Sequence, residues 1–407
     1  MITNLNARKT TAVLALALLL GGSLVSSSIS AAELVNPVDS GNMTCPNNYG
    51  FHTINTEREQ PSTTVQANNG LIYTVNHGNE SGDVTVTDLK TGKVVKQISL
   101  GNDLSTNKII APEACVTDGD YIYAIGGYYQ SVFTIDTKTN TLIKQVDSPT
   151  GANNSDNSFE SATIDVKNHH IYIGGEDNQI YSYNTTTSKF DKAISLKSIF
   201  SGQEKYNNSI IQEVFYDAGN VYFGGQVGID GNHGAAAAVV GVYNVSTNQV
   251  KHFKFPGVNG SKTSTDFLGE ATGIQGLDVV HIGKKTFLYE TSHVRQGELN
   301  IFDLTTEKVV ASYNKFENTL NGRPHSVVSL PNGKIGVGVQ ADDGSYLTVI
   351  DTNQNTDKGG KIVKSYLVVP KLNNKVNLHV VNNGQTLISP DRTEDEGKLW
   401  IYNNPAK

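Results

Sequence analysis

Short apolar runs that alternate with polar positions recur along the chain, and tight-turn residues separate them. A two-residue alternation rich in Tyr, Val, Ile and Thr is typical of strands in a partly buried sheet. One class of run follows a tight turn and comprises "LIYTV" (71–75), "YIYAI" (121–125), "HIYIG" (170–174), "VYFGG" (221–225) and "TFLYE" (286–290). A second class follows it, as in "DVTVTDL" (83–89) and "SVFTIDT" (131–137). Beyond residue 32 no sustained helical period occurs, so the sequence predicts an all-β protein.

A polar turn follows the second class of run in each repeat. It has the sequence "DLTTEKV" at Asp303, and related turns begin at Asp88, Asp136, Asn184, Asn244 and Asp351. Asn403 stands at the equivalent of the first turn residue in the last repeat. The period is therefore about 50 residues. An Asp or Asn side chain can accept a hydrogen bond from the backbone of such a turn, and the Thr and Gly or Asn positions accept its tight backbone. We predict that this turn joins the third and fourth strands of a four-stranded antiparallel meander.

Seven such units predict a closed ring of sheets. A single meander cannot bury both of its faces, whereas seven arranged radially bury them against one another. The last unit ends after its third strand, and an unassigned strand-like segment, "YGFHTINTE" (49–57), precedes the first unit. The predicted fold over residues 49–407 is therefore a seven-bladed β-propeller of four-stranded antiparallel blades, closed by an N-terminal strand that completes the last blade.

Residues 1–32 have the features of a signal peptide. Arg8 and Lys9 form a basic start, residues 12–20 are an apolar run too short to span a membrane, and small residues at 30–32 suit cleavage. Residues 33–48 would then form an N-terminal arm before the propeller. The sequence predicts an exported protein, periplasmic or secreted, without insertion into the membrane.

The charge of the exported chain disfavours nucleic acids as partners. Removing Arg8 and Lys9 from a net charge of −7 leaves about −9. Binding to DNA, RNA or an anionic membrane requires a positive surface that replaces counterions. A small molecule or an envelope protein is the expected partner.

Cys45 and Cys115 are the only two cysteines. An exported compartment is oxidising, so we predict a disulfide bond between them.

Candidate ligand-binding residues stand where strands of the repeat begin or end at the mouth of the central channel. In a propeller the first strand of each blade starts, and the second strand stops, on the same face. Ligand binding is predicted for Glu113, Glu160, Glu176, Glu213, Gln226 and Gln340, with Arg392 reaching in. For any one of these residues the competing interpretation is a strand end that faces water.

Histidines gather at the equivalent positions of other blades. Imidazole and carboxylate together suit a divalent transition metal. The candidate metal ligands are His77, Glu270, His293, His325 and His379. His293, His325 and His379, with Arg295 and Arg392, could instead position an anionic ligand.

The glycine pairs at Gly126 and Gly174 are predicted strand ends that need close packing or twist. No helix is predicted to follow them, so they do not form a phosphate-binding fingerprint.

The segment "IYTVNHGNESGDVTVTDLKTGKVVKQISLG" (72–101) resembles the YVTN-type repeat of exported seven-bladed propellers, and the likeness extends in weaker form over about residues 50–407. This resemblance implies the fold and an exported setting. It implies little about chemistry, because relatives include lyases, quinoprotein subunits and DNA-binding periplasmic proteins.

Three functions follow as hypotheses. The first is an exported non-catalytic binding propeller that holds a small ligand, a metal ion or a partner at a channel mouth lined by Glu and His. The second is a metal-assisted lyase or hydrolase acting on a polar, carbohydrate- or lactone-like substrate, with His293 or His325 as general base. The third is an interaction platform in an envelope assembly. The sequence does not decide whether the protein is an enzyme.

Overall fold

The computed structural model describes residues 52–56, 60–78, 82–101, 109–150, 158–196, 208–229, 232–253, 274–292, 298–313, 322–342, 344–370, 377–391 and 397–404. The chain divides into two units, Met1–Ala31 and Ala32–Lys407, and all described residues belong to the second. The predicted signal peptide and N-terminal arm lie outside the described residues.

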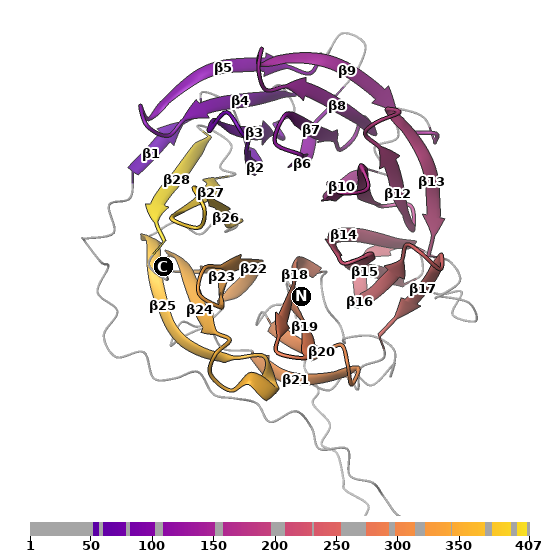
Figure 1. The fold of residues 1–407 in the computed structure, drawn as a ribbon, viewed down its shortest axis with the longest axis vertical. Coiled ribbons are helices and arrows are strands. Elements are labelled where there is room, and N and C mark those ends of the chain that lie inside the picture. Colours follow the sequence, from indigo (N-terminus) through magenta and orange to yellow (C-terminus); the bar gives the residue numbers. More distant parts are fainter. Residues whose placement is uncertain are drawn as a thin grey trace, which may run out of the picture. The chain divides into compact units, whose positions relative to one another are not determined.

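The described strands form seven four-stranded antiparallel sheets arranged as a ring (Figure 1). Blades 1 to 3 comprise β2 (Pro61–Gln66), β3 (Ile72–Asn76), β4 (Asp83–Asp88) and β5 (Lys93–Ser99); β6 (Pro112–Thr117), β7 (Tyr121–Gly126), β8 (Ser131–Asp136) and β9 (Thr141–Asp147); and β10 (Phe159–Asp165), β11 (His170–Gly175), β12 (Gln179–Asn184) and β13 (Lys189–Ser195). Blades 4 to 6 comprise β14 (Asn208–Asp217), β15 (Asn220–Ile229), β16 (Asn232–Asn244) and β17 (Gln249–His252); β18 (Ile274–Ile282), β19 (Lys285–Ser292), β20 (Glu298–Asp303) and β21 (Lys308–Tyr313); and β22 (Arg323–Leu330), β23 (Lys334–Ala341), β24 (Gly344–Asp351) and β25 (Lys361–Pro370).

The seventh blade joins the two ends of the propeller. It contains β26 (His379–Val381), β27 (Thr386–Asp391) and β28 (Lys398–Asn403), and its outer strand is β1 (His52–Asn55). β1 pairs antiparallel with β28, from His52 opposite Ile401 to Asn55 opposite Lys398. The predicted closure by an N-terminal strand is therefore confirmed.

The repeated polar turn lies between the third and fourth strands, as predicted. The side chain of its first residue accepts a backbone N–H two or three residues later, for example from Lys90 to Asp88 at 2.8 Å and from Thr305 to Asp303 at 2.9 Å. The fifth residue of every such turn has a positive φ, between 50° and 66°: Gly92, Asn140, Ser188, Asn248, Glu307 and Asn355. The left-handed position explains why Gly and Asn are frequent there.

The hydrophobic core consists of seven clusters, each placed between two neighbouring blades. Ile54 of β1 belongs to the cluster between blades 7 and 1, with Ile72, Ile388, Leu399 and Ile401. The closing strand therefore supplies apolar contacts as well as backbone hydrogen bonds.

Helical structure is nearly absent from the described part of the chain. It contains one short 3-10 helix, η5 (Thr356–Lys358), in the turn between β24 and β25. Within the described ranges, no helix is both long enough and apolar enough to cross a membrane.

The second and third strands of blade 4 are longer than those of the other blades. β15 and β16 extend into residues 228–238, with Ile229 opposite Asn232. Backbone pairing continues there because the extended strands satisfy each other's N–H and C=O groups.

A buried carboxyl group lies within blade 5. Glu290 has no exposed surface, and its Oε2 accepts a hydrogen bond from Asn300 Nδ2 at 2.9 Å. Asn300 Oδ1 in turn accepts from Ser312 Oγ at 2.7 Å. Burial raises the pKa of Glu290 to about 8, with a smaller contribution from the charge of Glu298.

Replacing Ile54 by Ala tests the closing strand. Ile54 is 4% exposed, so we expect Ile54→Ala to lower the free energy of unfolding by about 2–4 kcal/mol through lost burial and the remaining cavity. Ile143→Ala is the matched control: Ile143 is 53% exposed, and its loss should change stability by less than about 0.5 kcal/mol. Urea unfolding measures both. Equal changes in unfolding free energy for the two variants would show that the packing of β1 contributes little to the stability of the closed ring.

Glu290 gives the unfolding free energy a predictable pH dependence. Its pKa in the folded state is about 8, above the value of about 4.3 for an exposed Glu. Between these two pH values the carboxyl group is protonated in the folded state and ionised in the unfolded state. Its contribution to stability is therefore present at low pH and is lost as pH rises, by up to about 1.4 kcal/mol per pH unit.

We expect Glu290→Gln to remove this dependence, so that its stability relative to the wild type increases between pH 5 and pH 8. Chemical unfolding at a series of pH values measures the effect. Glu307→Gln, the same substitution on an exposed turn, should leave the dependence unchanged. An identical pH dependence in wild type and Glu290→Gln would refute the prediction.

Candidate functional site

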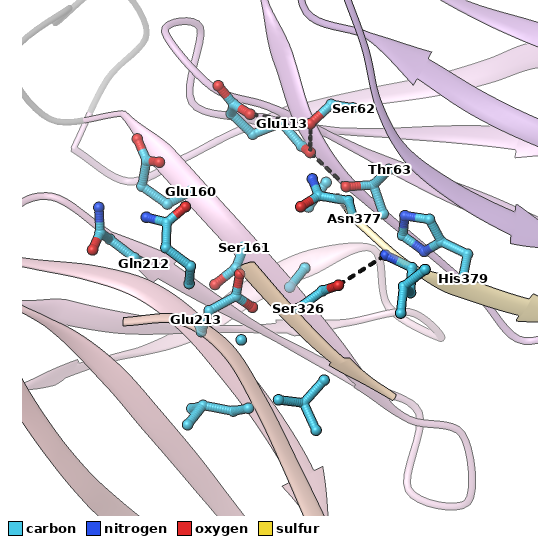
Figure 2. A pocket seen from close by; sticks show the side chains of 17 residues that line it. Ser62, Thr63, Glu113, Glu160, Ser161, Gln212, Glu213, Ser326, Asn377 and His379 are labelled. Carbon is cyan, nitrogen blue, oxygen red and sulfur yellow. Dashed lines mark hydrogen bonds between the residues drawn. The ribbon is translucent and has the colours of Figure 1, made fainter. Parts of the chain in front are cut away.

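The first strands of the blades surround a central cavity of about 250 Å³ (Figure 2). Residues from all seven blades line it, and most of them are polar. The polar lining residues are Ser62, Thr63, Glu113, Glu160, Ser161, Gln212, Glu213, Gln275, Ser326, Asn377 and His379.

A β-bulge near the start of the first strand occurs in six blades. At this point the pairing with the second strand shifts, for example from Pro112 opposite Gly126 to Ala114 opposite Ile125, so that Glu113 is the extra residue. A bulge redirects the side chain of its extra residue. Four single bulge residues line the cavity: Glu113, Glu160, Gln212 and Gln275.

The bulges also connect neighbouring blades. The backbone carbonyl of Glu113 accepts hydrogen bonds from two hydroxyls of blade 1, Thr63 Oγ1 at 2.8 Å and Ser62 Oγ at 3.0 Å. Between blades 6 and 7, the Leu378 N–H donates to Ser326 Oγ at 3.0 Å (Figure 2). Hydrogen bonds between neighbouring blades, one of them to the carbonyl of a bulge residue, thus hold the cavity wall together.

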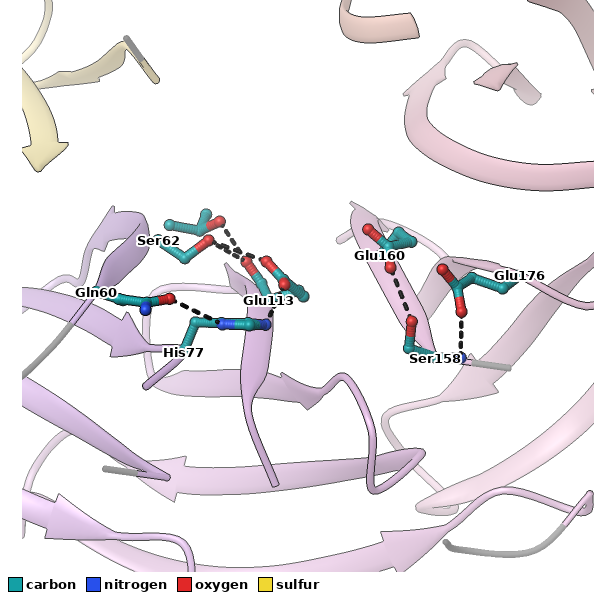
Figure 3. A network of polar contacts seen from close by, with 8 residues as sticks. Gln60, Ser62, His77, Glu113, Ser158, Glu160 and Glu176 are labelled. Carbon is teal, nitrogen blue, oxygen red and sulfur yellow. Dashed lines mark hydrogen bonds and ion pairs between the residues drawn. The ribbon is translucent and has the colours of Figure 1, made fainter. Parts of the chain in front are cut away.

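Three carboxylates line the cavity from consecutive blades 2, 3 and 4. Glu113 forms an ion pair of 2.5 Å with His77 Nε2 and accepts from Ser62 Oγ at 3.3 Å (Figure 3). Glu160 accepts from Ser158 Oγ at 2.8 Å (Figure 3). Glu213 is the third carboxylate.

His379 presents a neutral imidazole to the cavity. Burial lowers its pKa to about 4, against a hydrogen bond from the ring to the backbone carbonyl of Ser62. The residue keeps some exposed surface, but its Nε2 is fully buried and has no hydrogen-bond partner among the described residues. The proton must then lie on Nδ1, which leaves Nε2 as a hydrogen-bond acceptor.

Two other buried atoms of the cavity wall are also without a partner in the described structure. They are Ser161 Oγ, on a residue that is 6% exposed, and Gln212 Oε1. Buried polar atoms of folded proteins usually have a hydrogen-bond partner, so these atoms mark positions where the polar groups of a ligand would be stabilised.

Several described residues predicted from the sequence do not line the cavity. His325 is the bulge residue of blade 6 but has no exposed surface, and its Nε2 lies 2.6 Å from Gln340 Oε1. His77 pairs with Glu113, and Glu176 Oε2 accepts from the Ser158 N–H at 3.1 Å. The side chain of Gln226 and the residues Glu270, His293, Arg295 and Arg392 lie outside the described residues.

The sequence analysis missed Gln212, Gln275 and Ser161. It placed Glu213 at the position of Glu113 and Glu160, whereas the bulge register makes Gln212 their equivalent. The signal was present in the order of residues: an apolar residue, then the bulge residue, as in Pro112-Glu113, Ile211-Gln212 and Ile274-Gln275.

The metal and disulfide predictions remain untested. No group of three or more His, Cys, Asp or Glu side chains able to hold a metal ion occurs among the described residues, but Glu270 and His293 lie outside them. Cys115 is a buried free cysteine whose Sγ donates to the Thr63 carbonyl at 3.4 Å, and Cys45 lies outside the described residues.

No protein-family model and no curated protein sequence matches this chain. Many solved structures have a similar fold, and two of them illustrate the likeness. U3-55K is 10% identical with a TM-score of 0.61, over 87% of this chain and 98% of that chain. The WD40 repeats of RRP9 are 9% identical with a TM-score of 0.61, over 89% of this chain and all of that chain. At such low identity the similarity shows a shared β-propeller fold and carries no assignment of function.

Gly174 tests the close packing beside the bulge of blade 4. A Cβ at this position would lie 2.7 Å from the Ile211 carbonyl oxygen and 3.1 Å from Ser161 Oγ, which confirms the prediction that this glycine pair needs close packing. We expect Gly174→Ala to lower the free energy of unfolding by about 1–3 kcal/mol, because the backbone of blade 4 must shift. Urea unfolding measures this change. An unchanged midpoint of urea unfolding would mean that blades 3 and 4 can move apart without loss of stability.

Proposed function

We propose that this protein is an exported, non-catalytic binding propeller of the YVTN type that holds a small polar ligand in its central cavity. The observation that carries the proposal is the convergence of polar side chains on the cavity, with buried acceptor atoms at Ser161, Gln212 and His379 that have no partner in the described structure.

The size of the cavity supports a small ligand. A propeller has a central channel, and the cavity of about 250 Å³ in this one exceeds the roughly 30 Å³ that a water molecule occupies, so a small molecule has room there. Its wall comes from all seven blades and is fixed by hydrogen bonds between them, such as Thr63 to Glu113. A preformed wall of this kind reduces the conformational entropy that binding would otherwise cost.

His325 is not placed to act as the general base of a lyase or hydrolase, the alternative function. A general base must lie within hydrogen-bond reach of the substrate proton. His325 has no exposed surface and lies beside Gln340, away from the cavity wall. The binding hypothesis requires no such base.

A thermal-shift screen of the purified full-length chain against small molecules of cationic, anionic and neutral classes tests this proposal. At least one class should raise the unfolding temperature, since a ligand that binds only the folded state stabilises it. The double variant Glu160→Gln/Gln212→Leu should abolish the shift because it changes two cavity residues. The matched control Glu307→Gln/Gln354→Leu changes the same residue types on exposed outer turns and should retain it.

Native mass spectrometry and metal analysis of protein purified without chelator complete the test. Either would detect a co-purified ligand, metal ion or envelope protein, and its loss in the cavity variant but not in the outer-turn control would place it at the cavity. A ligand unaffected by the cavity variant, or the absence of any ligand in all three assays, contradicts the proposal.

A further inference from the structure

Building on the proposed binding function, we infer that the ligand of the central cavity is a small organic cation, a protonated amine on a short hydrocarbon chain. The carboxylates of three consecutive blades, the unpartnered acceptor atoms and the apolar part of the wall carry this inference.

The described cavity wall has a strong bias towards negative charge. Glu113, Glu160 and Glu213 contribute three carboxylates, and no Lys or Arg occurs among the described residues that line the cavity. Charges in a concave site with low-dielectric walls act more strongly on a ligand than charges on an open surface. Such a wall attracts a cation more strongly than an anion.

The unpartnered atoms give an independent reason. Ser161 Oγ, Gln212 Oε1 and His379 Nε2 are all able to accept a hydrogen bond, and Ser161 is more than nine-tenths buried. A ligand that donates hydrogen bonds can match all three. A primary ammonium group has three N–H donors and no acceptor, so its hydrogen-bonding groups suit acceptor atoms of this kind.

The partners of the carboxylates favour an amine over a bare metal ion. A metal ion needs several ligands that converge at about 2.0–2.6 Å. In the described structure no three His, Cys, Asp or Glu side chains meet this way, and carboxylates of the wall interact with protein groups, for example Glu113 with His77 and Glu160 with Ser158. An ammonium group donates hydrogen bonds over longer distances than metal–ligand bonds, and its acceptors can belong to different blades.

The remaining wall fits the hydrocarbon part of such a ligand. Apolar residues also line the cavity, among them Leu277 of blade 5 and Val327 of blade 6, each 6% exposed. A molecule with a cationic end and a short aliphatic chain can contact both parts of the wall.

Isothermal titration calorimetry of the full-length chain tests the inference with four probes: 1,4-diaminobutane, 1,4-butanediol, succinate and MnCl₂. We expect the diamine to bind at least about tenfold more tightly than the diol and succinate, and its affinity to fall as salt increases. Glu160→Gln and Glu213→Gln should each weaken diamine binding by about tenfold or more, and Gln212→Leu by a smaller factor. Glu307→Gln, on the outer turn, should leave it unchanged.

The outcomes separate this inference from the proposed function. Equal or tighter binding of the diol, succinate or Mn²⁺, lost in the cavity variants, would overturn the amine inference and leave the binding function intact. Diamine binding that both Glu variants retain would place it elsewhere and overturn the inference. The inference would also be overturned if the diamine does not bind while the thermal-shift screen finds a cavity ligand of another class. If no ligand of any class binds, the proposed function fails as well. Near-ultraviolet circular dichroism of each variant confirms folding, and Glu160→Ala or Glu213→Ala, which also removes the charge, replaces a Gln variant that does not fold.

Discussion

Burial of each sheet against its two neighbours is the constraint on which this structure depends. An isolated blade has two apolar faces, and the core clusters lie between blades rather than within them. Every blade therefore needs a partner on both sides, and only a closed ring supplies this for the first and last blades. The pairing of β1 with β28, and the packing of Ile54 against Leu399 and Ile401, meet that requirement.

The same ring brings seven first strands towards one axis, and the bulges decide which side chains reach it. An extra residue in a strand interrupts the alternation of faces and frees a carbonyl from the sheet. In blade 2 the freed carbonyl of Glu113 accepts two hydroxyls of blade 1, while its side chain lines the cavity. One local irregularity thus contributes both to the contact between blades and to the candidate site.

Differences between the repeats give the site its chemical character. The blades share one backbone pattern, but the bulge residue is Glu in blades 2 and 3, Gln in blades 4 and 5, and His in blade 6. The fold is shared with propellers of about 10% identity, so it identifies no ligand by itself. The asymmetric distribution of carboxylates, acceptors and apolar residues around the cavity is what favours one ligand class over another.

The sequence by itself determined the architecture, because the features that build it are local. The turn after each third strand needs an Asp or Asn such as Asp303 and a residue able to adopt a positive φ, and these recur at a fixed spacing that gives the number of blades. The cavity wall was decided only by tertiary structure. Glu213 and Gln212 are neighbours in sequence, and the pairing of β14 with β15 makes Gln212 the extra residue of the bulge. His325 stands at a bulge like Glu113, yet it packs against Gln340 and leaves the wall to Ser326. Strand alternation fixes the direction of a side chain only where pairing is regular, and at a bulge that direction depends on the register and on the neighbouring blade.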